Sequence, residues 1–121
     1  MVASSSVTRL ASAAAAVAIS AEMENAFECV AHSRQCRELG VNETLLQAVV
    51  DRAPVSGGSA DEMLAINVAR ELGRTHKLSD ATFAAVRARL GDKGTVDLIT
   101  AIGYYAMLAV CHVALDIKPG G

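Results

Sequence analysis

The chain has 121 residues, which suits a single domain, and 52% of them are hydrophobic although only 3% are aromatic and none is Trp. Alanine supplies 23 of the hydrophobic residues, so the composition favours a helical chain over a large aromatic core. The 11 Lys and Arg residues balance 13 Asp and Glu residues and form no basic run, which excludes the electrostatic footprint of a nucleic-acid-binding protein. Two Pro and nine Gly argue against a disordered chain. Because each alanine buries little apolar area, self-association is a plausible source of further burial.

The cysteines and the N-terminal segment indicate a cytoplasmic protein. Cys29 and Cys36 are seven residues apart, which on a helix is about 10.5 Å of rise and too far for a disulfide. The apolar stretch 10–19 is too short to cross a bilayer, so no membrane contact is expected. Residues 1–21 contain no acid, one Arg and five Ser, a composition that an organellar transit peptide shares, and this address is kept as an alternative.

Helix signals follow one another along the first half of the chain. A helical stretch is predicted from about residue 8 to residue 39, with a break near Ser20 and a left-handed C-cap at Gly40. Asn42 then caps a short helix that ends before Pro54. The Gly-rich segment 55–59 is the predicted hinge.

The second half is predicted to contain three helices and no strand. Ser59 and Glu62 form a capping box ahead of an amphipathic helix. Ser79 starts the next helix, Gly91 stops it, and a long apolar helix follows over about 95–115, running through the core or an interface. We therefore expect one all-α domain over residues 1–121, with 1–9 and 116–121 frayed.

The densest group of reactive side chains lies in residues 25–36. On a helix, Glu28 and His32 are i, i+4 neighbours, while Asn25 and Cys29 lie within one turn of this pair. A carboxylate beside an imidazole is a general acid/base unit, because the carboxylate orients the ring and raises its basicity. The same pair is also common on solvated helices, so spacing alone does not establish a site.

A zinc site made by Cys29, His32 and Cys36 is not favoured, because tetrahedral zinc needs ligand atoms within a few ångströms of each other. We therefore expect neither a metal nor a cofactor. His76 and His112 lie near predicted helix ends, where capping or partial exposure explains both.

Residues 27–41 (FECVAHSRQCRELGV) carry a more specific pattern. They resemble the aromatic-Glu-aromatic-x-x-His-x3-Ala-x3-Gly segment of the carboxymuconolactone decarboxylase-like family, within the AhpD-like superfamily. Segments 62–66, 78–83 and 97–107 resemble its later helices, so the similarity covers about 10–115. The resemblance implies an AhpD-like helical bundle with a long hydrophobic C-terminal helix, assembled as a homo-oligomer, often a trimer or hexamer.

The chain departs from this family at three positions. In the redox branch two catalytic cysteines form a C-x-x-C pair, and these positions fall on Asn25 and Glu28. The upstream Glu of the family's proton relay falls on Ala13. The redox pair is therefore absent, and any acid/base chemistry would have to proceed without the upstream carboxylate.

The leading hypothesis from the resemblance is a cofactor-free, lyase- or decarboxylase-like enzyme for a small carboxylated or lactone substrate. His32 would transfer the proton, Glu28 would orient or replace it, and Asn25 would hydrogen-bond a substrate oxygen. Cys29, Tyr104 and Tyr105 would line the substrate pocket, although core packing is the favoured explanation for the two tyrosines.

Two alternatives remain open. One is an AhpD-like thiol peroxidase that reduces hydroperoxides through Cys29, with Cys36 or Cys111 as a second thiol. The other is a catalytically decayed oligomeric scaffold, which Ala13 favours.

Overall fold

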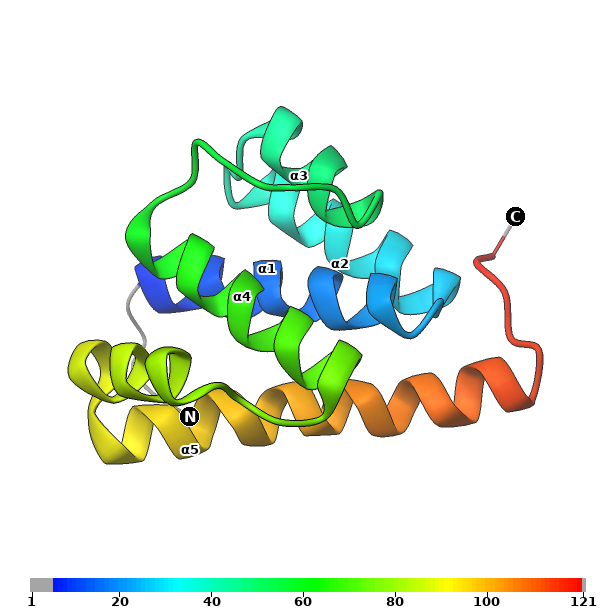
Figure 1. Ribbon diagram of the computed structural model, residues 1–121. Helices are drawn as coiled ribbons and strands as arrows, with labels where there is room; N and C mark the ends of the chain where they lie inside the picture. Colours follow the sequence, from blue (N-terminus) through cyan, green and yellow to red (C-terminus); the bar gives the residue numbers. More distant parts are fainter. Residues whose placement is uncertain (1–5, 121) are drawn as a thin grey trace.

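The first helix forms the centre of the fold. The computed structural model describes residues 6–120, and α1 (Ser6–Glu22) lies in it between α4 (Ala60–Thr75) and α2 (Ala26–Glu38), its main contacts (Figure 1). Every residue from 13 to 19 is less than 5% exposed. A helix that is apolar on all sides has to be buried, and the small alanine side chains let neighbouring helices approach closely. The alanine-rich segment is thus the core of the fold.

The chain turns between α1 and α2 later than predicted. The expected break near Ser20 is wrong, because α1 continues to Glu22 and the turn lies at residues 23–25. Glu24 has a φ of 58°, and the Asn25 side chain caps α2 by accepting a hydrogen bond from the Glu28 N–H. The predicted end of α2 is confirmed, since Gly40 has a φ of 89°.

The predicted caps of the following helices are present. Asn42 caps α3 (Glu43–Val50), whose buried residues are Leu45, Leu46 and Val49. At the start of α4 the Ser59 N–H donates to the Glu62 carboxylate at 2.8 Å, and the Glu62 N–H donates to the Ser59 hydroxyl at 3.1 Å. Local sequence is sufficient for both helix starts, because the capping groups lie within three residues of the N–H groups that they satisfy.

A close approach joins α1 to α4. A β-carbon at Gly73 would lie 2.8 Å from the Glu22 β-carbon and 3.2 Å from the Ile19 Cδ1 atom, so only glycine fits there without a shift. The next residue, Arg74, pairs with Glu22 through two hydrogen bonds of 2.9 and 2.8 Å. These contacts fix the C-terminal ends of the two helices against each other.

The last helical segment, α5 (Asp80–Ala114), consists of two helices joined at Gly91. Gly91 has a φ of 74° and a ψ of 179°, so it stops the first part as predicted, and the second part begins directly after it. Ser79 caps the first part by accepting from the Thr82 N–H. All five helices of residues 6–120 agree with the predicted all-α class, and no strand occurs in this range.

The two ends that were predicted to be frayed differ in the part that the structure describes. Residues 6–9 belong to α1 and are helical, whereas residues 1–5 and 121 lie outside the described part of the chain. Residues 117–120 have no regular secondary structure, in agreement with the prediction.

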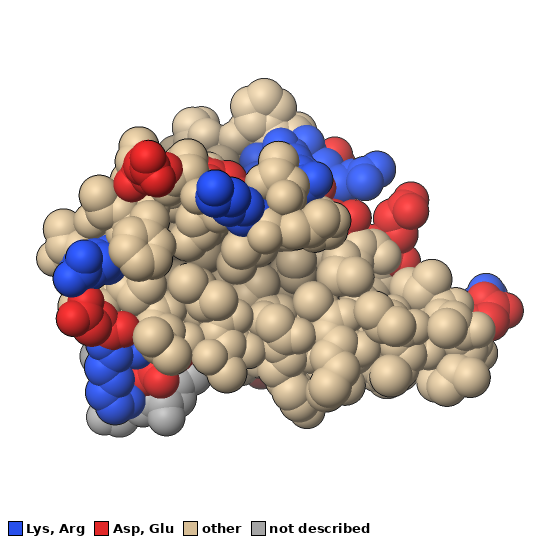
Figure 2. Space-filling model, turned by 60° about the horizontal axis from the view of Figure 1, so that its bottom comes forward, with Lys and Arg blue, Asp and Glu red and all other residues tan. Residues whose placement is uncertain are grey.

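The second part of α5 exposes a row of large apolar side chains. Five of its side chains are between 52% and 62% exposed, namely Val96, Tyr104, Met107, Val110 and Val113. We call these five residues the α5 face. Figure 2 shows the side of the molecule along α5 as a broad area without Lys, Arg, Asp or Glu. The prediction that this helix runs through the core holds only for its opposite side, which buries Leu98, Ile102 and Ala109.

By length and composition α5 could also cross a membrane, because it contains an 18-residue window with a mean hydropathy of 1.6. The sequence-based expectation was that no segment spans a membrane, and it placed this helix in the core or in an interface. Only 17% of the window is buried within the chain. The helix therefore carries an apolar surface that the monomer leaves uncovered.

Candidate active site

Glu28 and His32 make the contact that their spacing predicts. They lie one turn apart on α2, and the His32 Nε2 atom is 2.8 Å from the Glu28 Oε2 atom. The side chains of Glu28 and His32 are 12% and 15% exposed, respectively. The pair is thus partly shielded from water, where a charge interaction is stronger than on an open surface.

The His32 ring is oriented by two further contacts. Its Nδ1 atom lies 3.3 Å from the Gln35 carbonyl oxygen, an acceptor, so Nδ1 carries a proton in this arrangement. The ring also packs edge-on against Tyr105, with 4.7 Å between the ring centroids. Although Nε2 is close to the Glu28 carboxylate, their angle is not that of a hydrogen bond. Nε2 is therefore buried without a hydrogen-bond partner.

His112 lies beside the same carboxylate, which sequence reasoning missed. Its Nδ1 atom is 3.8 Å from Glu28 Oε1, and its ring packs edge-on against Phe27 at 4.9 Å. It is 16% exposed at the side chain. One signal could have pointed to it: Tyr105 and His112 are seven residues apart and so share one side of α5.

Asn25 connects α2 to α5 at this cluster. Its carbonyl oxygen accepts from the Glu28 N–H at 3.4 Å, which places its amide nitrogen 3.2 Å from His112 Nδ1. Because that nitrogen donates, Nδ1 of His112 accepts and the ring proton is on Nε2. Asn25 is only 1% exposed. These bonds occupy its carbonyl and one of its two N–H groups, so its first role is to orient His112.

The two tyrosines that were predicted to line a pocket have different environments. Tyr105 is half-buried, and burial, followed by the nearby Glu28 carboxylate, raises the pKa of its hydroxyl. Tyr104 is 54% exposed on the α5 face, and its ring is 5.6 Å from that of Tyr105. Tyr105 thus belongs to the Glu28 cluster, and Tyr104 lies at its outer edge.

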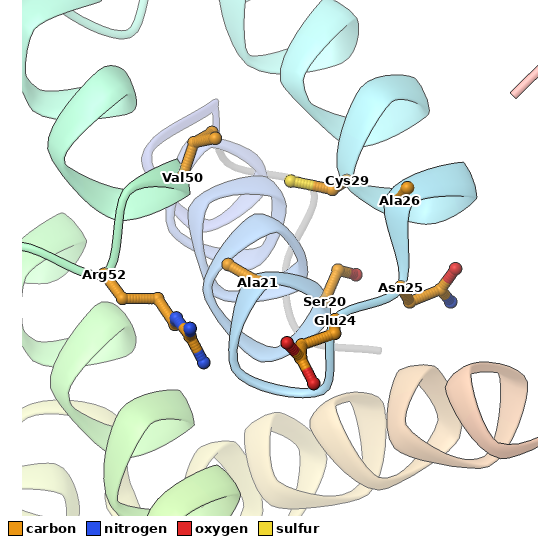
Figure 3. Close-up of a pocket in the computed structure, with 8 residues that line it drawn as sticks. All are labelled: Ser20, Ala21, Glu24, Asn25, Ala26, Cys29, Val50 and Arg52. Atoms are coloured by element: carbon orange, nitrogen blue, oxygen red, sulfur yellow. The ribbon is translucent and has the colours of Figure 1, made fainter. Parts of the chain in front are cut away.

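Cys29 lies on the other side of α2 from this cluster. It contributes to a solvent-open pocket of about 240 Å³ at the junction of α1, α2 and α3, where Ser20, Ala21, Val50 and Arg52 also lie (Figure 3). Neither Glu28 nor His32 lines this pocket. Burial raises the pKa of the Cys29 thiol, and a hydrogen bond with Ser33 partly opposes that effect.

The remaining cysteines do not complement Cys29. Cys36 is buried, which raises the pKa of its thiol to about 12, and Cys111 is exposed on α5. All three are free thiols, as the spacing of Cys29 and Cys36 predicts. A raised pKa lowers the fraction of reactive thiolate at neutral pH.

The structure also bears on the family's upstream Glu and on the zinc site considered from the sequence. Ala13, which stands where the family has its upstream Glu, is 4% exposed in the core, so α1 supplies no carboxylate from that position. Within residues 6–120, no three His, Cys, Asp or Glu side chains form a group that could hold a metal ion.

No protein-family model, curated protein or solved structure matches the chain in comparisons with known proteins. The likeness to the carboxymuconolactone decarboxylase-like family therefore depends on the motifs of the sequence itself.

Proposed function

We propose that the chain is a cofactor-free, lyase- or decarboxylase-like enzyme that acts on a small carboxylated or lactone substrate by proton transfer. One observation carries the proposal. The Glu28 carboxylate lies between two imidazoles, 2.8 Å from His32 and 3.8 Å from His112, in a cluster whose side chains are at most 16% exposed. Such a group can accept, hold and return a proton without a metal or an organic cofactor.

The contacts suggest a division of work within the cluster. His32 transfers the proton, because its Nε2 atom is close to Glu28 without being committed to it in a hydrogen bond. Glu28 stabilises the imidazolium that forms. Asn25 acts through His112, which it orients, and its hydrogen bond to a substrate oxygen stays a prediction.

We further propose that the enzyme is a homo-oligomer in which a second copy covers the α5 face. Burying one large apolar side chain contributes about 1.5–3 kcal/mol, and the face exposes five of them without a charge among them. A second copy is favoured over a membrane because the opposite side of α5 is packed in the bundle, so lipid could not surround the helix. The face includes Tyr104, which contacts Tyr105, so a neighbouring copy would border the Glu28 cluster.

The test is turnover of γ-carboxymuconolactone by the assembled protein and by the variants His32→Gln and Glu28→Gln. We expect each variant to lose at least a hundredfold in kcat with unchanged oligomer size. His76→Asn is the matched control, because His76 is exposed at the end of α4 in a left-handed conformation that Asn tolerates. Unchanged turnover in His32→Gln would remove the proposal.

The thiol peroxidase stays a second candidate, because Cys29 lines a pocket. The raised pKa of its thiol and the burial of Cys36 weigh against it. Peroxide-dependent thiol consumption that is lost in a triple Cys→Ser variant would favour the peroxidase. Inactivity towards both substrate classes would favour the decayed scaffold.

A further inference from the structure

We propose that the pocket at the junction of α1, α2 and α3 binds a small zwitterion, namely an α-amino acid with a short apolar side chain. This pocket borders the Glu28 cluster at Asn25, which belongs to both, but it is not lined by Glu28, His32 or His112, and the proposal does not depend on the function proposed above. The proposal rests on an unpartnered buried hydroxyl, two opposite charges at the rim, and the size and lining of the pocket.

The buried hydroxyl belongs to Ser20. The residue is 1% exposed, lines the pocket, and its Oγ atom has no hydrogen-bond partner. A buried hydroxyl without a partner costs about 1–3 kcal/mol, so such groups are rare unless a ligand or water satisfies them. Figure 3 shows the Ser20 oxygen pointing from α1 towards the start of α2, on the side where Asn25 lies. A ligand there would supply the missing partner.

Two opposite charges lie at the rim. Arg52 follows α3 and Glu24 precedes α2, and Figure 3 shows their guanidinium and carboxylate groups on the same side of the pocket, extending from opposite walls. The two side chains form no ion pair with each other, since no nitrogen–oxygen distance between them is within 4.0 Å. Arg52 and Glu24 each lie in a turn with a positive φ, 57° and 58° respectively. A molecule with both a carboxylate and an ammonium can pair with Arg52 and with Glu24 at the same time. A molecule with a single charge pairs with one of these side chains and is repelled by the other.

The size and walls limit the rest of the ligand. The volume of about 240 Å³ lies below the roughly 300–1,000 Å³ of sites for drug-sized molecules. The remaining lining comes from Asn25 and from the small or apolar residues Ala21, Ala26, Cys29 and Val50. A short apolar side chain, such as that of alanine or valine, fits these walls.

Titration calorimetry with L-alanine tests the proposal, with propionate and ethylamine as probes that each carry one charge. We expect L-alanine to bind with a Kd of about a millimolar, and each single-charge probe to bind at least tenfold more weakly. Arg52→Gln and Glu24→Gln should each weaken L-alanine binding at least tenfold, and Ser20→Ala should weaken it severalfold. Arg34→Gln is the control, because Arg34 is an exposed arginine of α2 outside the pocket.

Three outcomes would overturn the proposal. They are the absence of L-alanine binding at tens of millimolar, equal binding of propionate or ethylamine, and equal weakening by Arg34→Gln. His32→Gln should leave L-alanine binding unchanged, and loss of binding in that variant would also overturn the separateness of the two sites. Because the readout is binding, a negative result for the lyase leaves this test intact.

Discussion

Two apolar helices of this chain have opposite environments. Helix α1 is surrounded by the other helices, and its residues 13–19 are all less than 5% exposed. The second part of α5 is just as rich in apolar residues, yet five of its large side chains are more than half exposed. The difference is one of neighbours, because α1 lies between α2 and α4, while α5 has packed helices on one side only (Figure 1). Apolar composition predicts the need for burial, and the topology decides whether the chain meets that need alone.

The largest expected effect breaks the α1 side of this comparison. Ala16 is fully buried, so Ala16→Asp places an unpaired charge in the core and should unfold the protein, at a cost of at least about 4 kcal/mol. Ala85→Asp is the control, because Ala85 is an exposed helical alanine of α5 and should cost under about 1 kcal/mol. Circular dichroism during urea denaturation measures both. A folded Ala16→Asp variant with an unchanged midpoint would contradict the core position of α1.

The next effect breaks the α5 side. The double variant Met107→Asp, Val110→Asp should keep its helix content and lose self-association by a factor of several hundred or more, because each assembled interface would bury unpaired charges. Sedimentation velocity and light scattering without detergent measure the mass, again with Ala85→Asp as the control. A wild-type chain that is monomeric in water and binds lipid vesicles would overturn the second-copy interpretation and favour the membrane.

Thiol reactivity sharpens the comparison, because one cysteine lies in the core cluster around α1 and another lies on α5. Cys36 is buried with a thiol pKa of about 12, whereas Cys111 is exposed. Since the thiolate is the reactive form, Cys36 should react with iodoacetamide at pH 8 at least about a hundredfold more slowly than Cys111 in the double variant, where the α5 face is open. Peptide mass spectrometry over time measures both rates. Similar rates would show that the bundle around Cys36 opens readily.

The smallest effect compares two helical glycines. Gly73→Ala should destabilise the protein by about 1–3 kcal/mol, because its β-carbon would lie 2.8 Å from that of Glu22 and force α1 and α4 apart. A β-carbon at Gly103 would have no atom within 4 Å, so Gly103→Ala should stabilise the chain by about 0.5–1 kcal/mol through its higher helix propensity. Differential scanning calorimetry measures both changes in stability. Each glycine substitution is made in the Met107→Asp, Val110→Asp variant, so that self-association does not contribute to the measured stability. A stabilising Gly73→Ala would show that the close approach is loose.

The part of the candidate site that sequence predicts is the part within one helix. Glu28 and His32 meet because residues four apart on a helix are neighbours, whatever else the chain does. His112 joins them from 80 residues further along the chain than His32, and its place depends on where α5 crosses α2. The pocket at Ser20 and Arg52 is likewise a product of three helices. The spacing of Tyr105 and His112 places both on one side of α5, but no spacing within the sequence says which helix that side meets.

The helices themselves were almost entirely determined by sequence. Asn42, Ser59, Ser79 and Gly91 start or stop helices where predicted, because a cap acts on N–H groups of its own first turn and a positive φ at glycine is a local property. The turn at residues 23–25 was predicted a few residues too early, near Ser20. Glu24 adopts a positive φ there, and the sequence has no glycine at that point to indicate it. Only the tertiary structure decided that α1 is enclosed and that the α5 face is open, because burial depends on which helices pack together. The alanine-rich composition required apolar burial, and the packing shows that one chain supplies this burial for α1 and leaves the α5 face exposed.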